Sequence, residues 1–308
     1  MPFDRKTLVI PDNTNFEEHL IVTNGDVIVC DRSILEYGIK TDGRVFIGEG
    51  VSIDGDIYAD NDIRSDIFSV IKGNVYSGAN VYLGERVKIE GKLSLKGDLD
   101  VGDNVEIKEG FEAKGWINIR SPIPLVIYIF IYLLQLLKLG KSEEIEKILK
   151  ELEEDADEPI PISEIFLFIP NGTIIGLQKS KVDYNVKIGK NCRILGNYDI
   201  DGNLSLGDKS RLFGSVNSTG DVSLGREARI EGNITSKGEV KIEDKSIVNG
   251  DIYASKIILS KNASVKGTLF AENGVSFIQP SLHKKMKEKV KRFENNVDVV
   301  DEIKEILE

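Results

Sequence analysis

The sequence contains little of what enzymes and metal sites are built from. Its 308 residues include two histidines, His19 and His283, two cysteines, Cys30 and Cys192, and one tryptophan. Acyl transfer needs a histidine as general base and zinc binding needs neutral imidazole ligands, but His19 and His283 lie near the two ends of the sequence, outside its regular repeats. P-loop, GxSxG, HExxH and GGxGxD motifs are also missing. We therefore expect no enzyme, with no catalytic, cofactor-binding or metal-binding residue and no cofactor.

The charge balance excludes a further class. The net charge is −11, and no basic stripe is available to neutralise phosphates, so we expect no nucleic-acid partner. Neither cysteine belongs to a CxxC motif, which favours a reducing compartment. Residues Met1 to Val9 lack an apolar secretory core, and we expect a cytoplasmic protein.

The abundant feature is a repeat of six residues nested in eighteen. Glycines mark it at Gly25, Gly43, Gly55, Gly73, Gly91, Gly97 and Gly115, and again at Gly196, Gly202, Gly214, Gly220, Gly232, Gly238 and Gly250. Apolar residues between the glycines come in pairs at i and i+2, which is the spacing of a strand with one buried face. A fixed short period of this kind predicts a solenoid. Three short strands and three corners would close one triangular coil of a parallel β-helix.

Residues eighteen apart should stack in such a coil, and their sizes agree. Cys192, Ser210, Ala228 and Ser246 form one column of small residues, and Ala263 continues it after a single deletion. Asp and Asn recur beside the corner glycines, as in Asp54-Gly55-Asp56. We interpret them as turn residues, although a carboxylate pair could serve a glycosidase.

The predicted fold class is an all-β solenoid with helical additions. Two parallel β-helix arrays are expected at residues 1–120 and 164–280, an apolar and charged helical hairpin at 121–163, and a C-terminal helix at 281–308. The spacing leaves open whether the arrays form two rods or one. Lys284 to Arg292 are mainly basic and the last residues are acidic, and both clusters oppose the helix dipole. Such a helix needs a partner surface, so the tail is expected to cap the second array, to dimerise or to touch anionic lipid.

The hairpin contains the apolar run Leu125–Leu137. Thirteen residues make a helix of about 20 Å, too short for a hydrocarbon core of about 30 Å. The run is expected to pack over an end or flank of the β-helix or against a partner chain, and the alternative is an anchor at a membrane surface. The candidate membrane or partner contacts are Leu125, Ile127, Tyr128, Phe130, Tyr132 and Leu134.

The arrays resemble a known family. The pattern Ile47-Gly48-x-x-Val51-x-Ile53-x-Gly55-Asp56-Ile57 recurs from Leu83-Gly84, Ile188-Gly189, Leu206-Gly207 and Leu224-Gly225. It resembles bactofilins, the polymer-forming cytoskeletal proteins of bacteria and some archaea. The resemblance implies a right-handed β-helix that assembles end to end without nucleotide into nonpolar filaments, which lie at the membrane and recruit other proteins.

We therefore expect a cytoskeletal scaffold that associates with itself through the ends of its β-helix. The end coils predicted to do so carry Val27, Val29, Leu35, Ile39, Val265, Leu269, Val275 and Phe277. The alternative is a binding module that does not polymerise because the helices cap its ends. A third reading is a divergent hexapeptide-repeat transferase.

Overall fold

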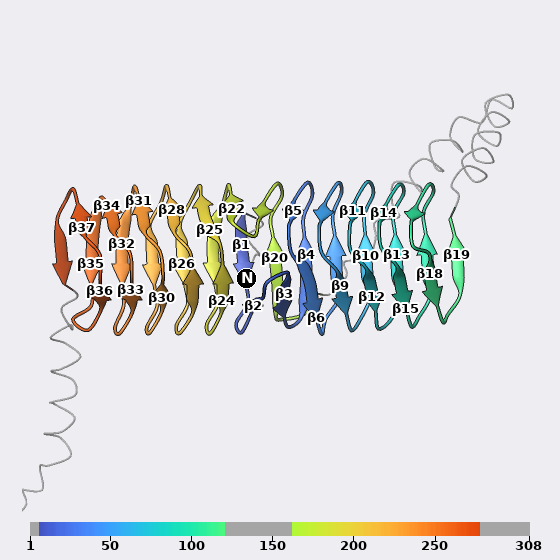
Figure 1. Ribbon diagram of the computed structural model, residues 1–308, viewed down its shortest axis with the longest axis horizontal. Coiled ribbons are helices and arrows are strands. Elements are labelled where there is room, and N and C mark those ends of the chain that lie inside the picture. The colour runs from blue at the N-terminus through green and yellow to red at the C-terminus, as the bar shows by residue number, and fades with distance from the viewer. Residues whose placement is uncertain (1–5, 121–161, 278–308) are drawn as a thin grey trace, which may run out of the picture.

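The computed structural model describes residues 6–120 and 162–277, which form one straight rod (Figure 1). Three long sheets run along it and enclose a single apolar core. Sheet 1 contains, in spatial order, β19 (Ile117–Ile119), β16 (Leu99–Val101), β13 (Val81–Leu83), β10 (Ile63–Ser65), β7 (Val45–Ile47), β4 (Asp26–Val29), β20 (Phe166–Ile169), β1 (Thr7–Ile10), β23 (Asn185–Ile188), β26 (Leu204–Leu206), β29 (Val222–Leu224), β32 (Glu239–Ile242), β35 (Lys256–Leu259) and β38 (Val275–Phe277).

The other two sheets contain 12 strands each and follow the same order along the rod. Sheet 2 contains β17 (Glu106–Ile107), β14 (Lys88–Ile89), β11 (Val70–Ile71), β8 (Ser52–Ile53), β5 (Ile34–Leu35), β21 (Ile174–Ile175), β22 (Lys179–Val182), β25 (Asn197–Ile200), β28 (Val216–Ser218), β31 (Ile234–Ser236), β34 (Ile252–Ala254) and β37 (Leu269–Ala271). Sheet 3 contains β18 (Phe111–Ala113), β15 (Leu93–Leu95), β12 (Val75–Ser77), β9 (Ile57–Ala59), β6 (Gly38–Thr41), β3 (Leu20–Thr23), β2 (Asn15–Phe16), β24 (Arg193–Leu195), β27 (Arg211–Phe213), β30 (Arg229–Ile230), β33 (Ile247–Val248) and β36 (Ser264–Val265).

The eighteen-residue coil predicted from the sequence is present in this structure. Strands pair in parallel with partners eighteen residues away, as in Val45↔Ile63 and Ile63↔Val81. These side chains point inward and are fully buried, and each contributes about 1.5–3 kcal/mol by leaving water. The column of small residues from Cys192 to Ser246 is also buried, as its sizes predicted. Stacking of like residues therefore builds the core.

The two halves of the rod are related by an internal pseudo-two-fold axis. Strands β3–β19 make the first half and β22–β38 the second, and residue pairs offset by 159 positions, such as Leu8 and Leu167, occupy equivalent places. The axis passes between β1 and β20, which pair antiparallel at Val9↔Phe168, two equivalent residues. The halves therefore run in opposite directions from the centre (Figure 1).

The leading strands of each half are exchanged at the centre. β1, which precedes the first half in sequence, pairs in parallel with β23 of the second half, and β20 pairs in parallel with β4 of the first. β2 pairs antiparallel with the next strand, β3, and in parallel with β24 of the second half. β21 likewise pairs antiparallel with β22 and in parallel with β5 of the first half. Each half thus covers the N-terminal edge of the other, and both expected arrays lie in the same three sheets.

The predicted fold class is wrong in its helical additions. The described residues contain strands, turns and bends and no helix. The expected hairpin, except for residues 162 and 163, and the expected C-terminal helix lie outside the described residues. At the centre, strand exchange supplies the cover for the edges that we had assigned to helices. No helix of the described ranges has the length and hydropathy to cross a bilayer.

A buried ion pair fastens the returning chain to the centre of the rod. The Asp26 carboxylate accepts hydrogen bonds from the backbone N–H of Ser163, at 2.9 Å, and from the side chain of Arg44, at 2.5 Å. Burial alone would raise the pKa of Asp26, but the hydrogen bonds from Arg44 and Ser163 outweigh it and hold that pKa below its ordinary value. The second half carries Asn185 at the equivalent position.

Close packing of the corners is testable by adding one methyl group. A Cβ on Gly214 would lie 2.1 Å from the carbonyl oxygen of Gly196 in the preceding coil. We expect Gly214→Ala to lower the free energy of unfolding by about 3 kcal/mol. Gly172→Ala is the control, because its positive φ of 67° costs about 1 kcal/mol while its Cβ would meet no atom within 4 Å. Urea titration measures both, and equal losses would contradict close packing.

The Asp26 ion pair predicts a specific pH dependence. Because the pKa of Asp26 is lowered on folding, its stabilisation is present above the ordinary carboxyl pKa of about 4 and is lost as the pH falls through the lowered value. We expect Asp26→Asn, which installs the residue of the second half, to cost about 1–3 kcal/mol at pH 7. The difference from the unmodified protein should shrink towards pH 2 in urea titrations. A difference that does not change with pH would contradict the ion-pair account.

Candidate self-association sites at the two ends of the rod

Both ends of the rod present unpaired strand edges. The outermost coil of the first half contains β17, β18 and β19, and that of the second half contains β36, β37 and β38. Within the described ranges, no strand pairs with the outer side of any of these six strands. An unpaired edge exposes a row of N–H and C=O groups that can pair with another chain. We call the two coils the first end and the second end.

The apolar core is open at each end. In the first half, the inward column ends at Leu99, which is 1 % exposed, and then at Ile117, which is 48 % exposed. In the second half, the equivalent step runs from Ile257, which is fully buried, to Val275, which is 43 % exposed. All four residues are aliphatic, so the exposure arises because no further coil of the described residues covers the column. Contact with another surface would bury these side chains.

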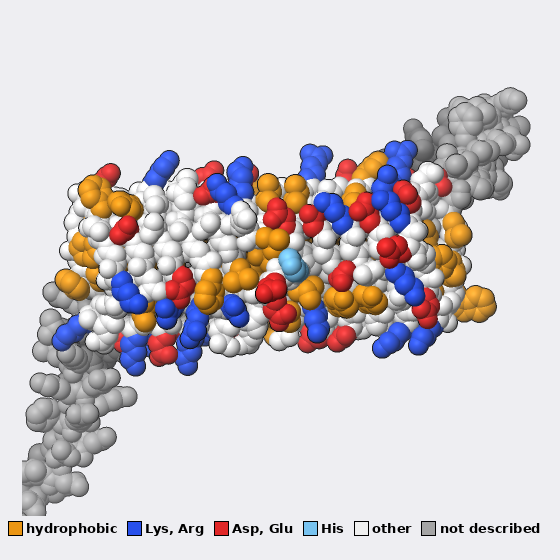
Figure 2. Space-filling model, viewed as in Figure 1, with side chains coloured by type: hydrophobic (Ala, Val, Ile, Leu, Met, Phe, Trp, Pro, Cys, Tyr) orange, Lys and Arg blue, Asp and Glu red, His pale blue; other side chains and the backbone are white. Residues whose placement is uncertain are grey.

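Further large apolar side chains lie on the same coils. The first end exposes Phe111, Trp116 and Ile119, and the second end exposes Phe270 and Phe277. Figure 2 shows hydrophobic side chains at both extremities, and on the flank between them a mixture of hydrophobic side chains and charges of both signs. The ends therefore combine unpaired backbone with apolar surface, which is the composition expected of an interface.

The corner acids and amides serve the backbone of the solenoid. Along one corner, Asp62 accepts the N–H of Asn80, Asn80 that of Asp98, and Asp98 that of Trp116, at 2.7–3.0 Å. The second half repeats the device, for example from Asn203 to the N–H of Asp221. These bonds support the turn interpretation of the corner carboxylates. Trp116 ends its column without an oxygen acceptor, so the first end does not offer this bond to a further coil.

The structure divides the predicted self-association residues into two groups. Val265, Leu269, Val275 and Phe277 lie on the second end. Val27, Val29, Leu35 and Ile39 lie near the centre, buried beneath neighbouring coils, where Val27 faces Leu167 and Leu35 faces Ile175. The membrane candidates Leu125, Ile127, Tyr128, Phe130, Tyr132 and Leu134 lie outside the described residues.

The first end was not predicted from the sequence. An end was expected at the N-terminal coil, whereas Phe111, Trp116, Ile117 and Ile119 lie in the outer coil of the first half. A signal was present in the sequence. Leu8-Val9-Ile10-Pro11 and Leu167-Phe168-Ile169-Pro170 open the two halves alike, which indicates equivalent leading strands that could meet.

Among the described residues, the two cysteines and His19 lie away from both ends of the rod. The described part of the chain holds no group of three or more His, Cys, Asp or Glu placed for a metal ion. Cys192 belongs to the core, where burial raises the pKa of its thiol and its Sγ lies 3.1 Å from the Pro11 carbonyl oxygen. His19 is exposed between β2 and β3.

Comparison with known families identifies the second half. Residues 186–276 match the family model Bactofilin, described as polymer-forming cytoskeletal. This match confirms the resemblance stated from the sequence, on the second array; it does not extend to the first. Searches of the curated proteins and of the solved structures gave no significant match.

The structural role of the corner acids predicts how their substitution behaves. Asp221 accepts the N–H of Glu239 at 2.7 Å, and Asn203 and Asn233 do the same in other coils. We expect Asp221→Asn to leave the free energy of unfolding nearly unchanged and Asp221→Ala to lower it by about 1 kcal/mol. Thermal unfolding distinguishes the two. An equal loss in both variants would mean that the charge, and not the acceptor, matters.

Proposed function

We propose, starting from the bactofilin domain at residues 186–276, that this chain is a structural protein that polymerises end to end. The observation that carries the proposal is the pair of open ends, each with unpaired strand edges and an inward column that is exposed only in its last residue. The family match supports polymer formation and a structural role without catalysis. Assembly needs no nucleotide in this proposal, because burial of apolar surface supplies the driving force.

The pseudo-two-fold axis makes the proposed polymer nonpolar. Both exposed ends are the C-terminal edges of their halves, since the N-terminal edges are joined at the centre. Contacts of the first end with another first end, and of the second with another second, would each be two-fold symmetric. Such contacts repeat the antiparallel arrangement already present between β1 and β20. A polymer built this way has no direction, as the likeness to bactofilins implies.

The proposed polymer is a cytoplasmic scaffold. Charged flanks between the ends keep the rod soluble and leave its sides free for recruited proteins (Figure 2).

Single charges at the ends test the proposal. We expect Ile117→Asp to block the first end and Val275→Asp the second, each weakening its own contact about a hundredfold, because a buried carboxylate costs several kcal/mol. Each single variant should then form two-chain particles through its remaining end, and the double variant single chains. Ile34→Asp is the matched control, because Ile34 is 41 % exposed on the flank and should leave filaments intact.

Nucleotide-free negative-stain microscopy and sedimentation across a salt series measure these sizes. Single variants that form single chains would indicate first-to-second-end contacts and a polar filament. Filaments that survive in the double variant would overturn the ends as the interface. Discrete unmodified particles of one size would favour the binding module that does not polymerise.

A further inference from the structure

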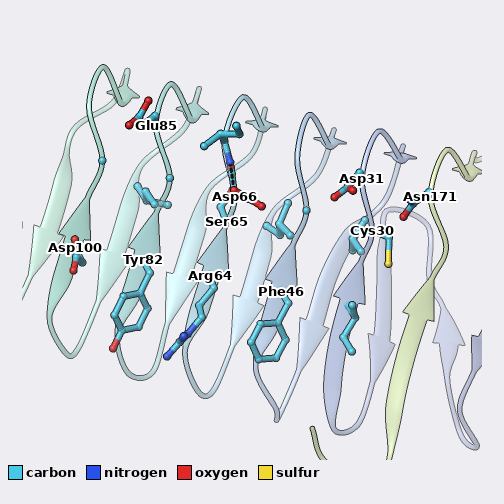
Figure 3. Close-up of a pocket in the computed structure, with 18 of the residues that line it drawn as sticks. Cys30, Asp31, Phe46, Arg64, Ser65, Asp66, Tyr82, Glu85, Asp100 and Asn171 are labelled. Atoms are coloured by element: carbon cyan, nitrogen blue, oxygen red, sulfur yellow. Dashed lines mark hydrogen bonds between the residues drawn. The ribbon is translucent and has the colours of Figure 1, made fainter. Parts of the chain in front are cut away.

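A long groove lies on the outer side of sheet 1 in the first half of the rod. It runs from Ile119 and Arg120 at the first end to Ile162 and Phe168 near the centre. Figure 3 shows Phe46, Arg64 and Tyr82 along its floor, on the successive strands β7, β10 and β13. Although outward-pointing on a surface sheet, these three side chains are only half exposed.

Two arginine–ring contacts lie at the floor of the groove, one between neighbouring coils and one within a single coil. The Arg64 guanidinium lies 4.5 Å from the Tyr82 ring centre, and that of Arg44 lies 5.1 Å from the Phe46 ring centre. Cation–π attraction at these distances favours arginines placed beside the rings. The floor therefore combines aromatic rings with the charge of Arg64.

The second half of the rod shows that the fold does not require this surface. The positions equivalent to Phe46, Arg64 and Tyr82 carry Ser205, Ser223 and Lys241, on strands with the same pairing. The two halves satisfy the same backbone geometry, so the large side chains of the first half need another explanation. Because these positions face outward, one explanation is that the large side chains contact an apolar occupant of the groove.

The rim limits the chemistry of that occupant. Asp31, Asp66, Glu85 and Asp103 lie along the corner side of the groove (Figure 3 labels the first three). An acidic or nucleic-acid occupant would be repelled there. An uncharged, apolar and aromatic segment fits the floor without opposing the rim.

The chain itself supplies such a segment, attached at both ends of the groove. Residues 121–161 follow Arg120 directly and end directly before Ile162, and both of these neighbours line the groove. The strands β19 and β20 are six strand spacings apart, about 29 Å, which a chain of this length spans easily. The segment contains Leu125–Leu137, which has no charged residue.

We propose that the uncharged run Leu125–Leu137 occupies this groove, over Phe46, Arg64 and Tyr82, while the acidic residues 143–158 stay outside its rim. Docking would bury the apolar run without its insertion into a membrane. It would also explain why the first half has an aromatic floor that the second half lacks. This inference does not depend on whether the rod polymerises.

Disulfide crosslinking in the full chain tests the proposal. In a Cys30→Ser, Cys192→Ser background, Tyr128→Cys is combined with either Tyr82→Cys or Tyr76→Cys. Tyr82 and Tyr76 lie in the same coil, on sheets 1 and 3, so a run seated on sheet 1 is close to Tyr82 and not to Tyr76. We expect the Tyr82 pair to crosslink about tenfold faster, because docking raises its effective concentration. Mixing tagged and untagged copies identifies crosslinks between chains.

A second measurement uses variants that the fold already accepts. Phe46→Ser with Arg64→Ser installs the residues of the second half, and we expect limited proteolysis within residues 121–161 to become about tenfold faster. Tyr76→Ser, on sheet 3, is the control and should not change that rate.

Three outcomes would overturn the docking. The first is equal crosslinking of the Tyr82 and Tyr76 pairs together with an unchanged proteolysis rate. The second is crosslinking only between different copies. The third is co-flotation with phosphatidylcholine vesicles that needs Leu125–Leu137 and occurs without the Tyr82 crosslink, which would make the run a membrane contact.

Discussion

The structure depends on one constraint: a parallel solenoid cannot satisfy the strand edges at its own two ends. Every interior strand pairs on both sides, but the first and last coils each leave backbone groups and the apolar core uncovered. At the centre of this rod the problem is solved by joining two N-terminal edges. β1 and β20 meet antiparallel and each continues the parallel sheet of the opposite half. The exchange makes the junction part of the fold instead of a contact between finished domains. It also determines that only C-terminal edges remain at the outside.

Internal duplication separates what the fold requires from what it merely permits. Inward positions agree between the halves, as do Leu8 with Leu167 and Val27 with Val186, because the core admits only apolar side chains of similar size. Corner positions agree in chemistry, since Asp26 and Asn185 both accept a backbone N–H from the next coil. Outward positions diverge freely, as Phe46 and Ser205 do. Differences at outward positions are therefore the place to look for functions that the two halves do not share.

The repeat period of the sequence predicts how residues stack within each coil array, but not how the two halves are joined. Spacing of two and eighteen predicts which residues stack within an array, so the columns from Val45 to Val81 and from Cys192 to Ser246 could be read directly. The contact Val9↔Phe168 joins residues far apart in sequence and has no spacing of its own. For that reason Val27 and Leu35 were placed at an end although they lie near the centre, and Ile117 was not recognised. The expected helices followed from local apolar spacing, which is a weak guide where tertiary contacts decide the structure.

The first end differs from many interior coils in a way that favours a two-fold contact over simple continuation of the solenoid. Asp and Asn side chains accept the corner N–H of the next coil at several places, as Asp98 does for Trp116 and Asp251 for Thr268. Trp116 offers no oxygen acceptor in its side chain and is 85 % exposed, so the corner column stops where the rod stops. A contact between two like edges does not use that bond. It needs apolar columns that can face each other and strand edges that can pair antiparallel. Ile117 and Val275 supply the first, and the centre of the rod demonstrates the second.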